Sequence, residues 1–185
     1  MTVTDVVRDV VQRLEAMQAD YQIVGALAYF LYGPVRFTSD VDFVVAMPAA
    51  ALDRLLTSLP PAYRIEPQAR MELFTGTMRW VVEVDGGDLK LEFFLLGSDA
   101  HHAEEFRRRQ RRQIAGADVE AWVATAEDLI IQKLRWARAK DLEDIRGMLF
   151  IQREALDFAY LARWTEVHGT SARLAEIRAS IPPGL

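Results

Sequence analysis

The sequence predicts an α/β fold followed by a helical C-terminal region. Short apolar runs typical of strands alternate with amphipathic helical segments up to residue 124, and only helical patterns follow it. With 185 residues, of which 51% are hydrophobic and 26% are charged, the chain is long enough and apolar enough to bury a core. We therefore expect an α/β domain at residues 1–124, with a helical region at residues 125–185 packed on it.

The first sixty residues predict two strands between three helices. Apolar residues recur at helical spacing from Val6 to Leu14, with Thr4 as the expected N-cap. The elements expected next are a short buried strand in YQIVG, a helix at Ala26–Tyr32 that stops at Gly33-Pro34, a strand at Asp40–Ala46 and a helix at Ala49–Ser58.

The middle of the chain changes to a strand pattern. The runs MELF, MRWVVEV and LKLEFFLL are apolar and favour strands, and Gly86-Gly87 between the last two predicts a hairpin. A short acidic helix is expected after Gly97. The arginine-rich stretch FRRRQRRQI and a strand in VEAWV follow.

The last third predicts four helices. Thr125 and Asp128 form a capping-box pattern ahead of LIIQKLRWARAK. The other three helices are expected around Leu142 to Phe150, from Glu154 to Val167 and from Ser171 to Ala179, ahead of Pro182-Pro183.

Composition excludes several classes of protein. A net charge of −5 creates no global field that attracts nucleic acid. The absence of cysteine excludes disulfides, thiolate metal sites and a cysteine nucleophile, and it fits the cytoplasmic location that we expect. No apolar run approaches the ~20 residues that span a bilayer, and charged residues interrupt the N-terminal pattern, so neither a membrane anchor nor a secretion signal is expected.

Two aspartates begin the strand expected at Asp40–Ala46. Side chains two apart on a strand face the same side, so Asp40 and Asp42 would project together, as carboxylates that hold Mg²⁺ must. Acids at the start of a strand are also common as turn formers or solvated charges. The continuous apolar strand that follows favours the metal site, because acids without partners would be costly there.

Two further features extend this candidate site. Gly25 opens the helix expected at Ala26–Tyr32, and backbone N–H groups at the start of a helix can contact phosphate. Glu92 lies inside the apolar run LKLEFFLL and is expected to have a partner. It is either a third carboxylate beside the aspartates or one side of an ion pair with a neighbouring arginine or lysine.

These motifs resemble the nucleotidyltransferase superfamily, which has the polymerase-β-like fold. Its pattern of hG[GS], Dh[DE]h and a later h[DE]h corresponds here to Gly25, Asp40 with Asp42, and Glu92. The spacing G-x-x-R-x-T-x-D-x-D, formed by Gly33, Arg36, Thr38, Asp40 and Asp42, and the helical segment at residues 127–145 are similar to small bacterial nucleotidyltransferases of the abortive-infection and toxin–antitoxin kind. The resemblance covers roughly residues 20–150.

The resemblance implies a nucleotidyltransferase fold with a mixed β-sheet flanked by helices. It implies transfer of an NMP group from an NTP to a hydroxyl, with Asp40, Asp42 and Glu92 as catalytic and metal-binding residues for Mg²⁺ or Mn²⁺. The residues assigned to nucleotide binding are Gly25, Ala26, Arg36, Ser39 and Lys133. Two positions depart from the superfamily: Ala26 replaces the preferred glycine or serine, and Glu92 replaces the commoner aspartate.

The acceptor implied by the resemblance is tRNA, in a toxin–antitoxin context with an antitoxin protein as partner. An antibiotic adenylyltransferase with a small-molecule acceptor is the second enzyme hypothesis. A nucleotidyltransferase fold that binds or regulates without catalysis is the third, and Ala26 is the main point in its favour.

Several charged residues have two interpretations. Arg36 either contacts a phosphate or forms a salt bridge with Asp40 or Asp42. Lys133 either contacts the triphosphate or lies at the surface. Asp141 and Asp144 are expected to cap their helix or to pair with Lys140 or Arg146. The run from Arg107 to Arg112 is either a guarded edge strand with alternating faces or a patch for a polyanion. His101, His102 and His168 are expected at the surface, and the four tryptophans in packing.

Overall fold

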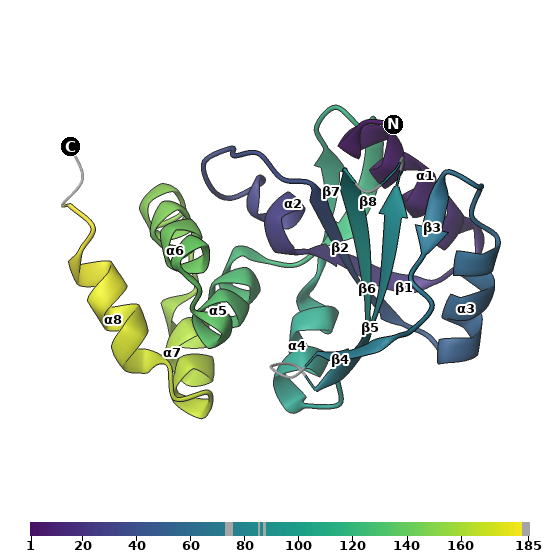
Figure 1. The fold of residues 1–185 in the computed structure, drawn as a ribbon. Coiled ribbons are helices and arrows are strands. Elements are labelled where there is room, and N and C mark those ends of the chain that lie inside the picture. Colours follow the sequence, from purple (N-terminus) through teal and green to yellow (C-terminus); the bar gives the residue numbers. More distant parts are fainter. Residues whose placement is uncertain (73–75, 85, 87, 183–185) are drawn as a thin grey trace. The chain divides into compact units, whose positions relative to one another are not determined.

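The computed structural model describes residues 1–72, 76–84, 86 and 88–182 (Figure 1). The chain divides into two compact units: unit 1 comprises Met1–Leu27 and Phe37–Ala124, and unit 2 comprises Ala28–Arg36 and Thr125–Leu185. The domain division expected after residue 124 stays a prediction. No helix among the described residues combines the length and the apolar character that a membrane crossing requires.

Unit 1 contains the strands and the N-terminal helices. Its helices are α1 (Val3–Ala16), α3 (Ala49–Thr57) and α4 (Ala100–Arg108), and α2 (Gly25–Tyr29) begins in it. Its strands are β1 (Asp20–Val24), β2 (Asp40–Ala46), β3 (Tyr63–Ile65), β4 (Arg70–Glu72), β5 (Thr77–Val84), β6 (Leu89–Leu95), β7 (Gln110–Ile114) and β8 (Val119–Val123).

These strands form one mixed sheet among the described residues. Their order is β3-β5-β6-β2-β1-β8-β7, and β4 pairs with β5. The pairs β2 with β6 and β1 with β8 are parallel, whereas β1 with β2, β5 with β6, and β7 with β8 are antiparallel. This architecture confirms the predicted α/β class with a mixed sheet.

The core of unit 1 lies on the sheet's apolar face. On β2 the residues alternate between fully buried and half-buried, and Val41, Phe43 and Val45 are the buried set. The Phe43 ring stacks on Phe93 of the parallel neighbour β6, with ring centroids 5.3 Å apart. Alternation fixes which face each residue occupies, because a slip of one residue would turn these rings to the opposite face.

Unit 2 is helical apart from its short N-terminal segment. Its helices α5 (Ala126–Trp136), α6 (Ala139–Ile151), α7 (Phe158–Val167) and α8 (Ser171–Ala179) lie together (Figure 1). Helix α5 contacts α6 and α7, and α8 contacts the same two helices. The Thr125 side chain accepts a hydrogen bond from the backbone N–H of Asp128, which confirms the predicted cap of α5.

Several predicted element boundaries were wrong. Thr2, not Thr4, caps α1, because Thr2 has the extended backbone of an N-cap and its side chain accepts from the Asp5 N–H. Helix α2 ends at Tyr29, and the chain continues in i→i+3 hydrogen bonds up to Tyr32. Helix α7 begins only at Phe158, because the Asp157 side chain caps it.

The predicted hairpin is present as a strand pair. β5 and β6 pair antiparallel with Val84 opposite Leu89, whereas Gly87 in the predicted turn lies outside the described residues. Leu73 and Phe74 of the predicted run MELF also lie outside them, as does Pro183.

The histidine prediction was wrong for two residues. His101 and His102 are buried, 1% and 6% exposed. They lie on the same face of α4 as Glu105 and Phe106, at the spacing of an amphipathic helix, so this helix buries polar side chains. Nδ1 of His102 lies 3.0 Å from Oδ2 of Asp99, the N-cap residue.

The arginine run is divided between a helix and a strand. Arg107 and Arg108 belong to the last turn of α4, so the predicted strand alternation from Arg107 onward was wrong. Arg109 is the C-cap of α4, and Arg111 and Arg112 belong to β7, which is the last strand in the sheet order, as the edge-strand interpretation predicts. Cations at the end of a helix are favourable because the helix dipole is negative there.

Candidate functional site

Asp40 and Asp42 lie on the half-buried face of β2. The strand alternates so that these two acids share one face, while Val41 and Phe43 point into the core. The Thr38 side-chain oxygen accepts a hydrogen bond of 3.2 Å from the backbone N–H of Asp40 and so supports the start of the strand. The structure therefore places the two aspartates together, as their spacing predicts.

The third predicted acid lies beside them. In the parallel pair of β2 with β6, Asp42 is in register with Glu92, and Asp40 is in register with Lys90. The carbonyl oxygen of Ser39 accepts a hydrogen bond of 2.8 Å from the Lys90 N–H and extends this pairing by one residue. Neighbouring strands are about 4.8 Å apart, so Asp40, Asp42 and Glu92 form one acidic surface, called here the acid face.

Gly25 lies directly against the acid face. Val24, at the end of β1, is paired with Asp42, and Gly25 follows it with a positive φ of 65°. A Cβ atom on Gly25 would lie 1.8 Å from Oδ2 of Asp42, so no larger residue fits without moving that carboxylate. The turn into α2, including the buried Ala26, is thereby held close to Asp42.

The donors on the acid face are of the kind that Mg²⁺ prefers. No group of three or more His, Asp or Glu side chains in the described part of the chain is placed to hold a metal ion. Protein sites for Mg²⁺ in nucleotide enzymes commonly supply only one or two carboxylates, and the substrate phosphates supply further oxygens. Asp40 and Asp42 on one strand face fit such a site.

Glu92 has a cationic partner. Nη1 of Arg79, on β5, lies 3.2 Å from both carboxylate oxygens of Glu92. This agrees with the ion-pair alternative for Glu92, and the register places Glu92 beside Asp42 as well. Arg79 was not among the predicted site residues, although strand alternation combined with the β5–β6 pairing places it diagonally across from Glu92.

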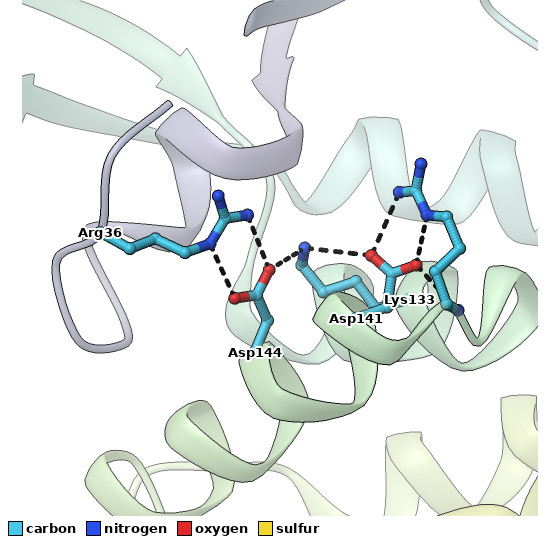
Figure 2. A network of polar contacts seen from close by, with 5 residues as sticks. Arg36, Lys133, Asp141 and Asp144 are labelled. Atoms are coloured by element: carbon cyan, nitrogen blue, oxygen red, sulfur yellow. Dashed lines mark hydrogen bonds and ion pairs between the residues drawn. The ribbon is translucent and has the colours of Figure 1, made fainter. Parts of the chain in front are cut away.

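Arg36 and Lys133 are brought together in unit 2 around Asp144 (Figure 2). Arg36 donates from Nε to Oδ1 and from Nη2 to Oδ2 of Asp144, each at 3.0 Å. Lys133 donates to the same Oδ2 at 2.7 Å, and its Nζ lies 3.7 Å from Oδ1 of Asp141. We call Arg36, Lys133, Asp141 and Asp144 the charge cluster.

The charge cluster is largely buried. The side chains of Asp141 and Asp144 are 1% and 3% exposed, and that of Lys133 is 8% exposed, so Lys133 is no surface lysine. Burial by itself raises the pKa of the Asp144 carboxyl, but hydrogen bonds and charges from Arg36 and Lys133 outweigh it and hold the pKa below its usual value. Asp144 is therefore ionised at neutral pH.

The partners predicted for Asp141 and Asp144 were wrong. Asp141 accepts from the backbone N–H and the side chain of Arg138, so it does cap α6, but its side-chain partners are Arg138 and Lys133. Asp144 pairs with Arg36, 108 residues away in sequence. Helical spacing identifies only neighbours on one helix, and so it cannot identify partners contributed by α5 and the segment 28–36.

Tyr29 lies beside the charge cluster, and no sequence pattern indicated it. Its ring centroid lies 5.7 Å from the Arg36 guanidinium carbon and 5.6 Å from the Lys133 nitrogen. Gly33 lies against the same ring, since a Cβ there would be 2.2 Å from Tyr29 Cε2. This close contact accounts for Gly33 in the G-x-x-R spacing.

Comparison with known proteins agrees with this fold. Residues 1–176 match the model of a family described as "Nucleotidyltransferase of unknown function (DUF6036)". A search of curated proteins finds no match.

Several solved structures share the fold of this chain at low sequence identity. The chain is similar to the antibiotic-resistance factor ANT(2'')-Ia, solved in complex with adenylyl-2''-tobramycin, with a TM-score of 0.63, 12% identity, and coverage of 93% of this chain and 99% of that one. It is similar to the lincomycin-bound lincosamide antibiotic adenylyltransferase LnuA, with a TM-score of 0.54, 13% identity, and coverage of 82% and 98%. The chain is also similar to an antigenic nucleotidyltransferase-like protein from Paracoccidioides brasiliensis, with a TM-score of 0.51, 18% identity, and coverage of 97% of this chain and 94% of that one. At these identities the likeness establishes the fold.

Proposed function

Because the chain belongs to the DUF6036 family of nucleotidyltransferases of unknown function, we propose that it transfers an NMP group from an NTP to a hydroxyl of an acceptor, with Mg²⁺ held by Asp40 and Asp42. One observation carries this proposal. Asp40 and Asp42 share a strand face with Glu92 in register, and Gly25 brings the backbone turn against the Asp42 carboxylate.

The proposed reaction uses the acid face for binding and for proton transfer. Mg²⁺ or Mn²⁺, when bound, supplies positive charge that neutralises the triphosphate oxygens. Glu92 accepts the proton of the acceptor hydroxyl as its oxygen forms a bond to the α-phosphorus. The bond from that phosphorus to the bridging oxygen breaks, and pyrophosphate leaves with the electron pair. Glu92 then returns its proton to water.

Backbone groups at the turn complete the proposed donor site. Glycine at position 25 lets the backbone pass directly beside the Asp42 carboxylate. The N–H groups of Gly25 and Ala26 would therefore lie near a metal-bound triphosphate and would contact its β- and γ-phosphates. Ser39 is assigned to nucleotide contact because it lies directly before Asp40. The assignment of Arg36 and Lys133 to nucleotide binding stays a prediction, and their charges are directed at Asp144.

For the acceptor, a small cationic molecule is better supported than tRNA. Arginines of the basic run are engaged in ion pairs: Arg107 with Glu104 at 3.8 Å, Arg109 with Asp20 at 2.7 Å, and Arg111 with Glu15 and Glu120. Paired arginines contribute little to polyanion binding. The net charge of −5 also favours a cationic acceptor. The toxin–antitoxin context and an antitoxin partner rest on the resemblance alone.

A binding protein without catalysis is the rival from another class. Ala26 supports it, because a serine or glycine is preferred there. The two aspartates on one face of β2 speak against it, since neighbouring carboxylates repel one another and a bound cation would relieve that repulsion.

Calorimetric titration of each NTP with Mg²⁺ tests the proposal. We expect one of the four NTPs to bind wild type only when Mg²⁺ is present, and the Asp40→Ala/Asp42→Ala variant to lose this binding. Asp53→Ala, which removes an exposed carboxylate of α3, is the matched control and should bind as wild type does. Failure of folded wild type to bind any NTP would overturn the proposal.

The donor found in this way then identifies the acceptor class. Labelled NTP is incubated with the protein and either total tRNA or a panel of aminoglycoside and lincosamide antibiotics. Label on the small molecules supports the antibiotic hypothesis, and label on tRNA supports the toxin hypothesis.

A further inference from the structure

The Arg79–Glu92 pair gives one of the three acids a different environment from the other two. Arg79 lies two residues before Val81, which is paired with Glu92 across β5 and β6, so its side chain emerges on the same face. One nitrogen, Nη1, is 3.2 Å from Oε1 and 3.2 Å from Oε2. The two side chains are only 28% and 21% exposed, so solvent screens the pair incompletely.

This geometry puts a permanent cation where a metal ion shared by both oxygens would bind. Nη1 is equidistant from Oε1 and Oε2, which is the position of a cation chelated by the carboxylate. A guanidinium remains protonated under all physiological conditions. A divalent ion brought to Glu92 would therefore face a positive charge within a few ångströms, and the two would repel each other.

A hydroxyl group meets no such obstacle. A carboxylate offers about four lone-pair positions, and one arginine nitrogen centred between its oxygens leaves the outer ones available for a hydrogen bond. An acceptor hydroxyl is neutral and donates a proton, so the guanidinium does not repel it.

We propose that Arg79 is a positioning residue that keeps Glu92 out of metal coordination and holds it for the acceptor hydroxyl. This inference rests on the proposed function, in which Glu92 accepts the proton, and it gives the structural reason why Glu92 is no metal ligand. Asp40 and Asp42 alone bind the cation that accompanies the NTP, and the Arg79 charge neutralises Glu92 in place of a second ion. The proton of the acceptor hydroxyl passes to Glu92 as the new oxygen–phosphorus bond forms and pyrophosphate leaves.

Counting bound Mn²⁺ tests this inference without turnover. Mn²⁺ is titrated by electron paramagnetic resonance into protein saturated with an NTP analogue whose α–β bridge is a methylene group. We expect one ion per chain in wild type and two in Arg79→Met, at Mn²⁺ concentrations up to about ten times those that fill the second site of the variant. Arg79→Met/Glu92→Gln should return to one ion, because the released carboxylate is then absent.

Arg64→Met is the matched control. Arg64 on β3 forms a cross-strand ion pair with Glu83 on β5, so its loss removes a pair of the same kind that does not involve Glu92. We expect one ion per chain in this variant.

A second variant serves if Arg79→Met does not fold. Glu92→Gln in the wild-type background should leave the Mn²⁺ affinity within about twofold, because Glu92 is no metal ligand. Two ions in wild type, or a tenfold weaker Mn²⁺ affinity in Glu92→Gln, would overturn the inference and leave the proposed function intact. Absence of any Mn²⁺–nucleotide binding by wild type would overturn both.

Discussion

The acid face of unit 1 and the charge cluster of unit 2 use the same residue types under different conditions. On the acid face, Asp40 and Asp42 are half-buried and lie beside a third carboxylate. In the charge cluster, Asp141 and Asp144 are almost fully buried, and cations from three segments of unit 2 hold them at distances as short as 2.6 Å.

This difference distinguishes a binding surface from a structural network. Buried charges persist only when partners within the protein compensate the loss of water. Half-buried carboxylates on one strand face are still reached by solvent, so a cation from solution can approach them. We therefore expect substitution in the charge cluster to affect folding, and substitution on the acid face to affect ligand binding.

The largest effect is expected for Asp144→Ala. This change leaves Arg36 and the buried Lys133 without their shared carboxylate, and breaking a buried pair in this way costs about 3–5 kcal/mol. The free energy of unfolding from urea titration measures it. Asp53→Ala, at an exposed position, should change that free energy by less than about 0.5 kcal/mol. Equal stability of the two variants would contradict a structural role for the cluster.

The contribution of Asp144 should also disappear in acid. Its pKa is lower in the folded state than the ordinary value of 3.8, so its stabilisation is complete above about pH 4 and is lost as the pH falls through the folded pKa. The difference in unfolding free energy between wild type and Asp144→Ala should therefore narrow below about pH 4. A difference that stays constant from neutral pH down to about pH 3 would show that the loss is one of packing and not of charge.

A smaller effect is expected for Gly25→Ala. The matched control is Gly76→Ala, because Gly76 has the same φ of 65° but, among the described residues other than its chain neighbours, none lies within 4 Å of an added Cβ. Backbone strain alone should cost about 1 kcal/mol at Gly76, and the clash with Asp42 should add about 1–3 kcal/mol at Gly25. Thermal unfolding measures both. If Gly25→Ala/Asp42→Gly recovered none of the stability lost in Gly25→Ala, the clash would not be the cause.

The smallest effect on stability is expected for Asp40→Asn. Without divalent ions the free energy of unfolding should change by less than about 0.5 kcal/mol, because the group is half-exposed. Affinity for Mn²⁺ with nucleotide should nevertheless fall more than about tenfold. A loss of stability as large as that of Asp144→Ala would remove the distinction between the two regions.

Local sequence patterns were sufficient to predict the α/β class, strand β2 with its start at Asp40, the cap of α5 and the candidate acids. These features depend on local periodicity and capping, in which each residue interacts with neighbours a few positions away. The spacing of Asp40 and Asp42 was enough to place both on one face of β2.

The partners of these residues, in contrast, depend on how the strands and helices are arranged in space. The register of β2 with β6 sets Glu92 beside Asp42, the β5–β6 pairing brings Arg79 to Glu92, and Asp144 finds Arg36 from far along the chain. Sequence patterns record which face a residue occupies, whereas ion pairs depend on which strands and helices become neighbours. The same limit explains His101 and His102, whose burial follows from the packing of α4 and not from their polarity.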